Sequence, residues 1–315
     1  FLSKSLHTKV SIDLGFEKRS SCVENHFLSF TEFSSTPAES HDSDTTITDI
    51  FEDMGSGRTL LILGEPGSGK TVTLLKLLES LISNAENDMN QPLPVVINLS
   101  SWAKQRSTIF DWLVKELHKN YGVSKSVVRL WLDHEQLLLM LDGLDEVDLR
   151  FQNECVRALN DFIQDYGLTE IVICSRVKDY ENLSERLKLR SAIYVQPLTV
   201  EQISFFLEQA GESLSALKTF FYRSAELRDF VSSPLLLSIM CLTYQGCSIE
   251  TFENMDISCG KYKPLFENYI ERMLSRRSNT RKYSREETLA WITWLAQQMR
   301  QNSESFFLIE QLQPS

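Results

Sequence analysis

The segment GEPGSGKT at residues 64–71 restricts the possible folds of this chain more than any other stretch. It matches the pattern GxxxxGK[ST], follows a short apolar run at 59–63 and opens a helical pattern at 71–83. Glycines let a backbone wrap closely around a phosphate, so that successive N–H groups and the positive end of the next helix face it. The segment therefore predicts a phosphate-binding loop between a strand and a helix.

Each residue of this loop is a candidate contact for a nucleotide. We expect Lys70 to reach the β- and γ-phosphates and the Thr71 hydroxyl to ligate Mg²⁺. The candidate nucleotide-binding residues of the loop are Gly64, Glu65, Pro66, Gly67, Ser68, Gly69, Lys70 and Thr71.

Short apolar runs alternate with helical patterns over residues 59–195. Their near-continuous apolar character is typical of strands that are buried on both faces of a parallel sheet covered by helices. We therefore predict an α/β fold with a doubly wound pattern. The five expected strands are Thr59–Leu63, Pro94–Leu99, Leu137–Leu141, Glu170–Cys174 and Ala192–Val195.

After Pro197 the strand patterns stop, and the sequence becomes helical in character. Apolar positions at helical spacing follow each of several start signals. The second half of the chain is therefore expected to be all helical. Three pairs predict helix starts by capping or by proline at the first helical position: Thr199 with Gln202, Ser233 with Pro234, and Ser284 with Glu287.

Acidic and basic residues that are candidates for the nucleotide site follow two of the expected strands. The run at 137–141 delivers Asp142 to the carboxyl end of the sheet, where phosphates and Mg²⁺ bind in sheets of this type. Asp145 and Glu146 come next and are candidates to position or activate an attacking water; the alternative is that they are solvated loop acids. Arg176 ends another strand and is a candidate contact for a γ-phosphate, or else a surface arginine paired with an acid.

Composition narrows the classes of partner. With 43 Asp and Glu against 32 Lys and Arg, the formal net charge is -11, which disfavours broad binding to nucleic acid or anionic lipid. No apolar run approaches the ~18 residues of a membrane span, and no signal peptide is seen. None of the six cysteines forms a CxxC pair, so a zinc site is disfavoured and a reduced setting fits best. We expect a cytoplasmic protein without a membrane or nucleic-acid partner.

Several segments together resemble the NACHT family of STAND-class P-loop NTPases, particularly its bacterial members. The resemblance covers residues from about 47 to 315, and NLSSWA at 98–103 also resembles those bacterial modules. The segments that carry it are GEPGSGKT, LLLMLDGLDEV, IVICSR, QPLTVEQISFFL and SSPLLLSIMCL.

The resemblance implies a domain organisation. It places a NACHT nucleotide-binding domain with a P-loop NTPase sheet at 46–198, a small helical domain at 199–258 and the start of a winged-helix domain at 259–315. Residues 1–45 have no counterpart, and their composition favours a linker or the end of an upstream region. Weak apolar patterning at Val10–Phe16 is compatible with a short helix or strand.

The resemblance also implies roles for individual residues. ATP or ADP with Mg²⁺ would be the cofactors, with Thr71 and Asp142 on the metal and Asp145 or Glu146 in hydrolysis. Arg176 matches the sensor 1 arginine, whose strand is expected beside the strand that ends at Asp142. Pro234 matches the proline of the helical domain that packs near the adenine base.

Family members of this kind are slow ATPases that act as ATP/ADP signalling switches. They form homo-oligomers when ATP is bound and control an effector output, with effector and sensor domains here expected outside this chain. Bacterial relatives are linked to defence against phage. Two alternatives remain open, a steady-turnover motor ATPase resembling AAA+ proteins and a winged-helix DNA-binding regulator.

Overall fold

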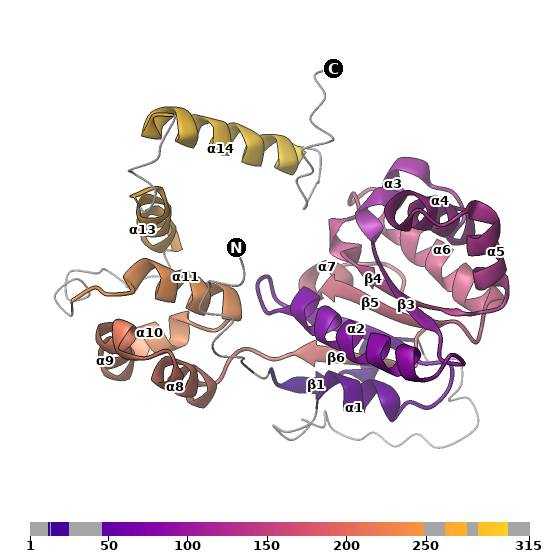
Figure 1. Cartoon of the computed structure of the whole chain (residues 1–315), viewed down its shortest axis with the longest axis horizontal. Coiled ribbons are helices and arrows are strands. Elements are labelled where there is room, and N and C mark those ends of the chain that lie inside the picture. The colour runs from indigo at the N-terminus through magenta and orange to yellow at the C-terminus, as the bar shows by residue number, and fades with distance from the viewer. Residues whose placement is uncertain (1–11, 13, 25–45, 249–261, 276–282, 302–315) are drawn as a thin grey trace. The chain divides into compact units, whose positions relative to one another are not determined.

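The computed structural model describes residues 12, 14–24, 46–248, 262–275 and 283–301 (Figure 1). These residues form two compact units. The sheet unit takes the described residues of 16–66 and 70–195, and the helical unit takes most of those from Gln196 onward.

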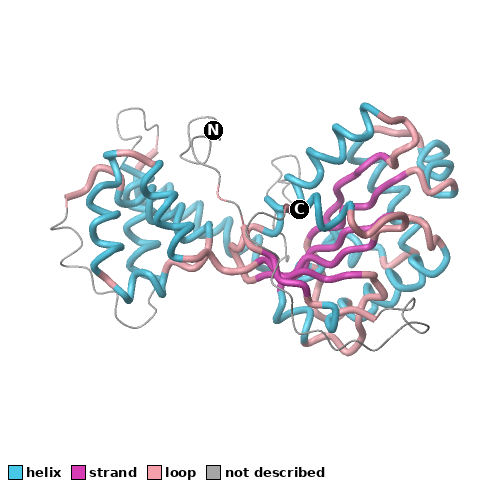
Figure 2. The backbone as a smooth tube through the Cα atoms, turned by 90° about the horizontal axis from the view of Figure 1, so that it is seen from below, coloured by secondary structure: helices cyan, strands magenta, loops and turns pink. Residues whose placement is uncertain are grey.

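The sheet unit is built on six strands in the order β1-β6-β2-β5-β4-β3, drawn in magenta in Figure 2. Every neighbouring pair is parallel except β1 and β6, and helices flank the sheet. The predicted α/β P-loop fold is thus confirmed, with all five expected strands present. The strands are β1 (Phe16–Lys18), β2 (Thr59–Gly64), β3 (Leu93–Asn98), β4 (Leu137–Asp142), β5 (Glu170–Arg176) and β6 (Ser191–Val195).

The sixth strand, β1, overlaps only at Phe16 with the weak apolar pattern of Val10–Phe16, which was compatible with a short helix or strand. It lies within residues 1–45, where the composition favoured a linker and apolar patterning is weak. Phe16 pairs with Val195 and Lys18 with Ile193, so β1 adds an antiparallel edge to an otherwise parallel sheet. A strand of three residues gains its stability from this pairing and leaves little periodic signal in the sequence.

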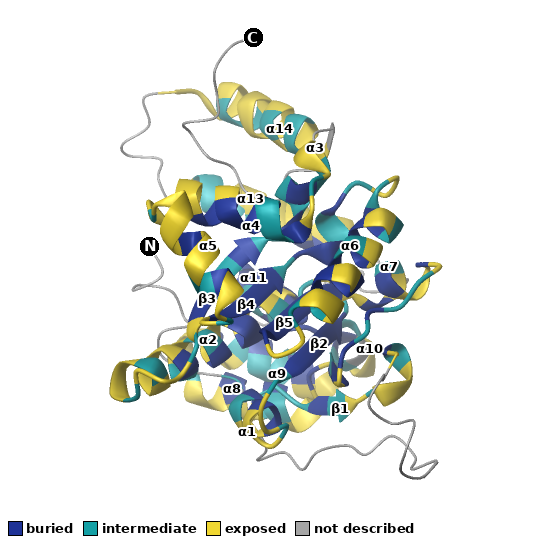
Figure 3. Ribbon diagram, turned by 90° about the vertical axis from the view of Figure 1, so that its right-hand side faces the viewer, coloured by how far each residue is buried: buried dark blue, intermediate teal, exposed yellow. Residues whose placement is uncertain are grey.

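The central strands form the most deeply buried part of the sheet unit (Figure 3). Leu60, Leu61, Ile62 and Leu63 of β2 have no exposed surface, which explains why their run is apolar on both faces. Amphipathic helices cover the sheet with their apolar faces. The helices of this unit are α1 (Ile47–Glu52), α2 (Lys70–Asn87), α3 (Trp102–Gln105), α4 (Ile109–Tyr121), α5 (Lys125–Asp133), α6 (Gln152–Asp165) and α7 (Val177–Glu181).

The described part of the helical unit contains only helices and turns, as the sequence predicted. Thr199 and Gln202 form the expected capping box, and Pro234 occupies the first turn of a helix capped by Ser233. None of the described helices of either unit is long and apolar enough to cross a membrane. The helices here are α8 (Val200–Gln209), α9 (Ser215–Arg223), α10 (Ala225–Phe230), α11 (Pro234–Tyr244), α13 (Tyr262–Ser275) and, up to Leu295, α14 (Arg285–Gln301).

The strand order determines which strand ends are neighbours. β5 lies between β2 and β4, so the predicted placement of the Arg176 strand beside the Asp142 strand is confirmed. Gly64 is in register with Arg176, and Asn98 of β3 is in register with Asp142. The carboxyl ends of four parallel strands therefore meet at one edge of the sheet.

A buried ion pair joins the amino-terminal ends of β2 and β5, at the edge of the sheet opposite to their carboxyl ends. Arg58, which precedes β2, binds Glu170 of β5 through two hydrogen bonds of 2.8 and 2.6 Å, and the two side chains are only 12% and 10% exposed. The Arg58 guanidinium also lies 4.5 Å from the centre of the Phe51 ring in α1. This pair ties α1 to the two central strands.

We expect Glu170→Gln to lower the free energy of unfolding by about 3 kcal/mol, because it leaves the Arg58 charge buried without a counter-charge. The matched control is Arg157→Gln, which breaks an exposed pair with Glu185 and is expected to cost less than about 1 kcal/mol. Chemical denaturation of both variants measures the difference. Equal losses would show that the Arg58 pair does not stabilise the sheet.

Candidate functional site

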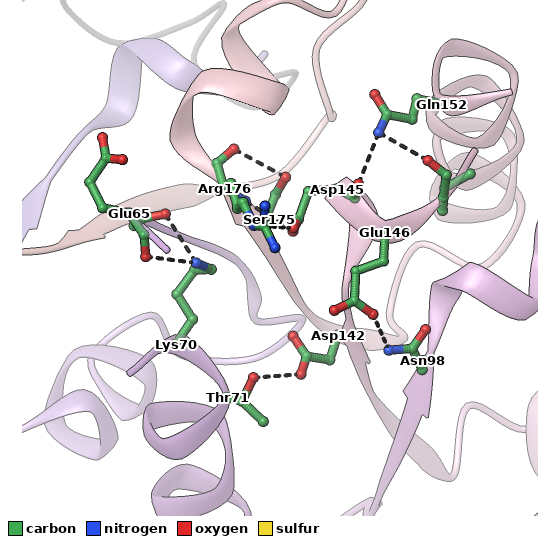
Figure 4. A network of polar contacts seen from close by, with 12 residues as sticks. Glu65, Lys70, Thr71, Asn98, Asp142, Asp145, Glu146, Gln152, Ser175 and Arg176 are labelled. Atoms are coloured by element: carbon green, nitrogen blue, oxygen red, sulfur yellow. Dashed lines mark hydrogen bonds and ion pairs between the residues drawn. The ribbon is translucent and has the colours of Figure 1, made fainter. Parts of the chain in front are cut away.

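The phosphate-binding loop connects β2, which ends at Gly64, to α2, which begins at Lys70. Gly67 and Gly69 have φ angles of +74° and +98°, in the left-handed region that glycine adopts without strain. The Lys70 ammonium donates to the carbonyl oxygens of Gly64 and Glu65 at 3.0 and 3.1 Å (Figure 4). Burial lowers the pKa of Lys70, and the nearby Asp145 carboxylate opposes that shift.

Thr71 and Asp142 meet across the sheet edge. The Thr71 hydroxyl, in the first turn of α2, donates to Asp142 Oδ2 at 2.8 Å, although the two residues are 71 positions apart in the chain. Burial raises the pKa of Asp142, and the hydrogen bond from Thr71 partly offsets it. A hydroxyl and a carboxylate side by side are oxygen ligands of the kind Mg²⁺ takes, in the arrangement that P-loop NTPases use. The residues present therefore fit the metal.

Asp145 binds Arg176. Asp145 Oδ2 lies 2.8 Å from Arg176 Nε, and Oδ1 accepts the Arg176 backbone N–H at 3.0 Å. The Asp145 side chain is 7% exposed and that of Arg176 48%. Burial raises the pKa of Asp145, while the Arg176 and Lys70 charges lower it. Arg176 therefore pairs with an acid, as one of the two interpretations of the sequence held, and this acid, Asp145, is itself a candidate site residue.

Glu146 has a different partner. It ends a short 3-10 turn, Leu144–Glu146, and its Oε2 accepts a hydrogen bond of 2.7 Å from the Asn98 side-chain amide (Figure 4). Gly143 makes room for this contact, because a Cβ there would lie 2.7 Å from Glu146 Oε2 and 3.0 Å from Asn98 Nδ2. Asn98 was not among the residues singled out for the site. Its only signals in the sequence were its place at the end of an expected strand and the NLSSWA segment.

The structure thus brings Glu65, Lys70, Thr71, Asp142, Asp145, Glu146 and Arg176 to one edge of the sheet (Figure 4). Pro66 and Ser68 lie on the loop between β2 and α2. Pro234 begins α11 of the helical unit, so its predicted place near an adenine base stays a prediction.

We expect Gly143→Ala to lower the free energy of unfolding by about 2 kcal/mol, because its φ of +77° strains any other residue and the new methyl group crowds Glu146. Gly122→Ala is the matched control. Its φ of +69° imposes the same strain, but no atom lies within 4 Å of the added Cβ, so we expect only about 1 kcal/mol. Denaturation curves compare the two. If crowding is the cause, adding Glu146→Ala to Gly143→Ala restores part of the lost stability. Equal losses of stability in Gly143→Ala and Gly122→Ala would contradict crowding as the cause.

Comparison with known proteins identifies the domain that carries this site. The family model for the NACHT domain matches residues 58–212, and a search among curated proteins found no match. Similar solved structures include the ORC1 protein of Aeropyrum pernix in complex with DNA, at 16% identity and a TM-score of 0.42, with 70% of this chain and 60% of that chain covered. The Aeropyrum pernix ORC2 protein in ADPNP-ADP complexes matches at 12% identity and a TM-score of 0.41, with 79% and 83% covered. Because the family model spans the phosphate-binding loop, the acidic loop and Arg176, residues 58–212 of this chain form a NACHT domain.

Proposed function

We propose that this protein binds ATP or ADP with Mg²⁺, hydrolyses ATP slowly and acts as a signalling switch. The observation that carries the proposal is the contact between Thr71 and Asp142 at 2.8 Å, beside the loop that holds Lys70. This contact brings together two segments that are distant in the chain, as a shared nucleotide and metal site requires. The domain that holds them is a NACHT domain.

In this proposal Gly64–Thr71 wraps the phosphates, and Lys70 neutralises charge on the β- and γ-phosphates. To do so the ammonium turns from the carbonyl oxygens of Gly64 and Glu65 toward the nucleotide. Thr71 and Asp142 hold Mg²⁺, which when bound supplies positive charge against the phosphate oxygens. The cation also compensates the burial of the Asp142 carboxylate.

Glu146 is the candidate general base. Both carboxylate oxygens of Asp145 are engaged by Arg176, Oδ1 by a hydrogen bond from its backbone N–H and Oδ2 by an ion pair with its guanidinium, whereas Glu146 uses Oε2 for Asn98. Within the described ranges, no hydrogen bond engages Glu146 Oε1, so this oxygen can face a water. Glu146 would take a proton from that water as its oxygen bonds to the γ-phosphorus and the bond to the departing ADP breaks. Asp145 then serves to hold Arg176.

The switch would depend on Arg176. A γ-phosphate competes with Asp145 for the guanidinium, whereas ADP offers no group at that place, so the two nucleotides favour different arrangements of the acidic loop. We propose that this difference controls self-association and an effector output, through a helical domain at 199–258 with Pro234 near the base and a winged-helix start at 259–315. A cytoplasmic role in bacterial antiphage defence rests on the family resemblance.

We expect Glu146→Gln to keep ATP·Mg²⁺ bound and to slow single-turnover hydrolysis by about 100-fold or more, because it removes the proton acceptor and leaves the metal ligands in place. Lys70→Ala is the contrasting variant and should lose most of its ATP affinity in calorimetric titration. Hydrolysis at the wild-type rate in Glu146→Gln would refute the assignment of the base. Fast, continuous turnover by the wild type would favour a motor over a switch.

We expect Arg176→Ala to weaken ATP binding by about 10-fold while ADP binding stays nearly unchanged, because only ATP gains the charge-assisted contact. In the wild type, Arg176 must give up its pair with Asp145 to contact the γ-phosphate, and this cost offsets part of the free energy gained from the phosphate contact. Side-by-side calorimetry with both nucleotides measures the ratio. An unchanged ATP/ADP ratio would refute a sensing role, and a thermal melt identifies a folding defect.

A further inference from the structure

Asn98 lies at the end of β3, in register with Asp142, and its side chain reaches the candidate base. Its amide nitrogen donates to Glu146 Oε2 at 2.7 Å. The amide oxygen accepts the backbone N–H of Ser100 at 2.8 Å. A carboxylate only accepts and a backbone N–H only donates, so these two partners fix which end of the amide faces Glu146.

The turn that carries Asn98 is held from the other side by α4. Ser101 Oγ donates to the backbone carbonyl oxygen of Asn98 at 3.3 Å, and the indole N–H of Trp112 donates to Ser101 Oγ at 3.0 Å. Trp112 belongs to α4 and has no exposed surface. The buried Trp112 side chain therefore holds the backbone at Asn98 through Ser101, and the Ser100 N–H holds the Asn98 side-chain amide, so Asn98 is oriented before any substrate binds.

The partner of Glu146 is a neutral amide, and this sets it apart from Asp145. Arg176 contacts both carboxylate oxygens of Asp145, whereas the single amide donor of Asn98 holds one oxygen of Glu146 and fixes the direction of its carboxylate. Because Asn98 engages Oε2, the second oxygen is the one left to meet a water.

We infer that Asn98 is a positioning residue for ATP hydrolysis, which holds Glu146 so that Oε1 faces the attacking water. The inference rests on the proposed function, in which Glu146 is the base. Asn98 touches neither the phosphates nor the metal in this role. It acts on the hydrolytic step through Glu146 alone.

The variant that isolates this role is Asn98→Asp. It keeps the size of the side chain and an oxygen for the Ser100 N–H, and it replaces the amide donor with a second carboxylate. We expect single-turnover hydrolysis to fall by about 10- to 100-fold, with ATP affinity and melting temperature nearly unchanged. The matched control is Asn87→Asp, the same change at an exposed position of α2 whose side-chain amide donates to the Ser83 carbonyl oxygen, and it should leave all three quantities unchanged. If Asn98→Asp melts early or loses ATP, Asn98→Ala, which removes the donor without adding charge, takes its place.

A double-mutant cycle with Glu146→Gln gives the deciding readout. If Asn98 acts through Glu146, then Asn98→Asp slows the wild type but produces no further loss in Glu146→Gln. An equal loss in both backgrounds, or no loss in the wild type while Glu146→Gln is slow, would overturn the role of Asn98 and leave the proposed function intact. A Glu146→Gln variant that hydrolyses at the wild-type rate would instead defeat the assignment of the base.

Discussion

The position of β5 between β2 and β4 is the constraint on which the whole candidate site depends. Parallel strands of similar length end at the same edge of a sheet, so the residues that follow them are forced together. Gly64, Arg176 and Asp142 reach that edge from three segments spread over more than a hundred residues of chain. A different strand order would leave the same residues at the ends of strands that do not touch. The apolar strands that hold this order have almost no exposed surface, so hydrophobic burial keeps the charged groups in place.

The charged groups at this edge are arranged so that each acid has its own partner. Asp142 meets a hydroxyl, Asp145 an arginine and Glu146 an amide. These partners differ in charge and in hydrogen-bonding capacity, and the three carboxylates are therefore suited to different tasks although they lie within five residues of sequence. Burial raises the pKa of Asp142 and Asp145, which makes a bound cation or a paired arginine valuable at each.

Much of this site could be predicted from the sequence, because its strongest signals are local. A phosphate-binding loop is a fixed spacing of glycines, a lysine and a hydroxyl residue, and its φ angles are local properties. The buried parallel strands were also predictable, since burial on both faces leaves uninterrupted apolar runs. Near β1 the sequence left both a short helix and a strand open, because a three-residue edge strand depends on its pairing with β6 and not on its own pattern.

The pairings inside the site could not be read from the sequence. The segment LDGLDEV places three acids near a strand end. Nothing in it indicates that Arg176 pairs with Asp145 or that Asn98 donates a hydrogen bond to Glu146. Those choices depend on the register of β3 with β4 and on the left-handed turn at Gly143, which directs the two following acids apart. The sequence alone determined the fold class and the chemical groups available, because backbone patterning and residue type are local. Only the tertiary structure decided which group meets which, because that depends on strand order and register between segments far apart in the chain.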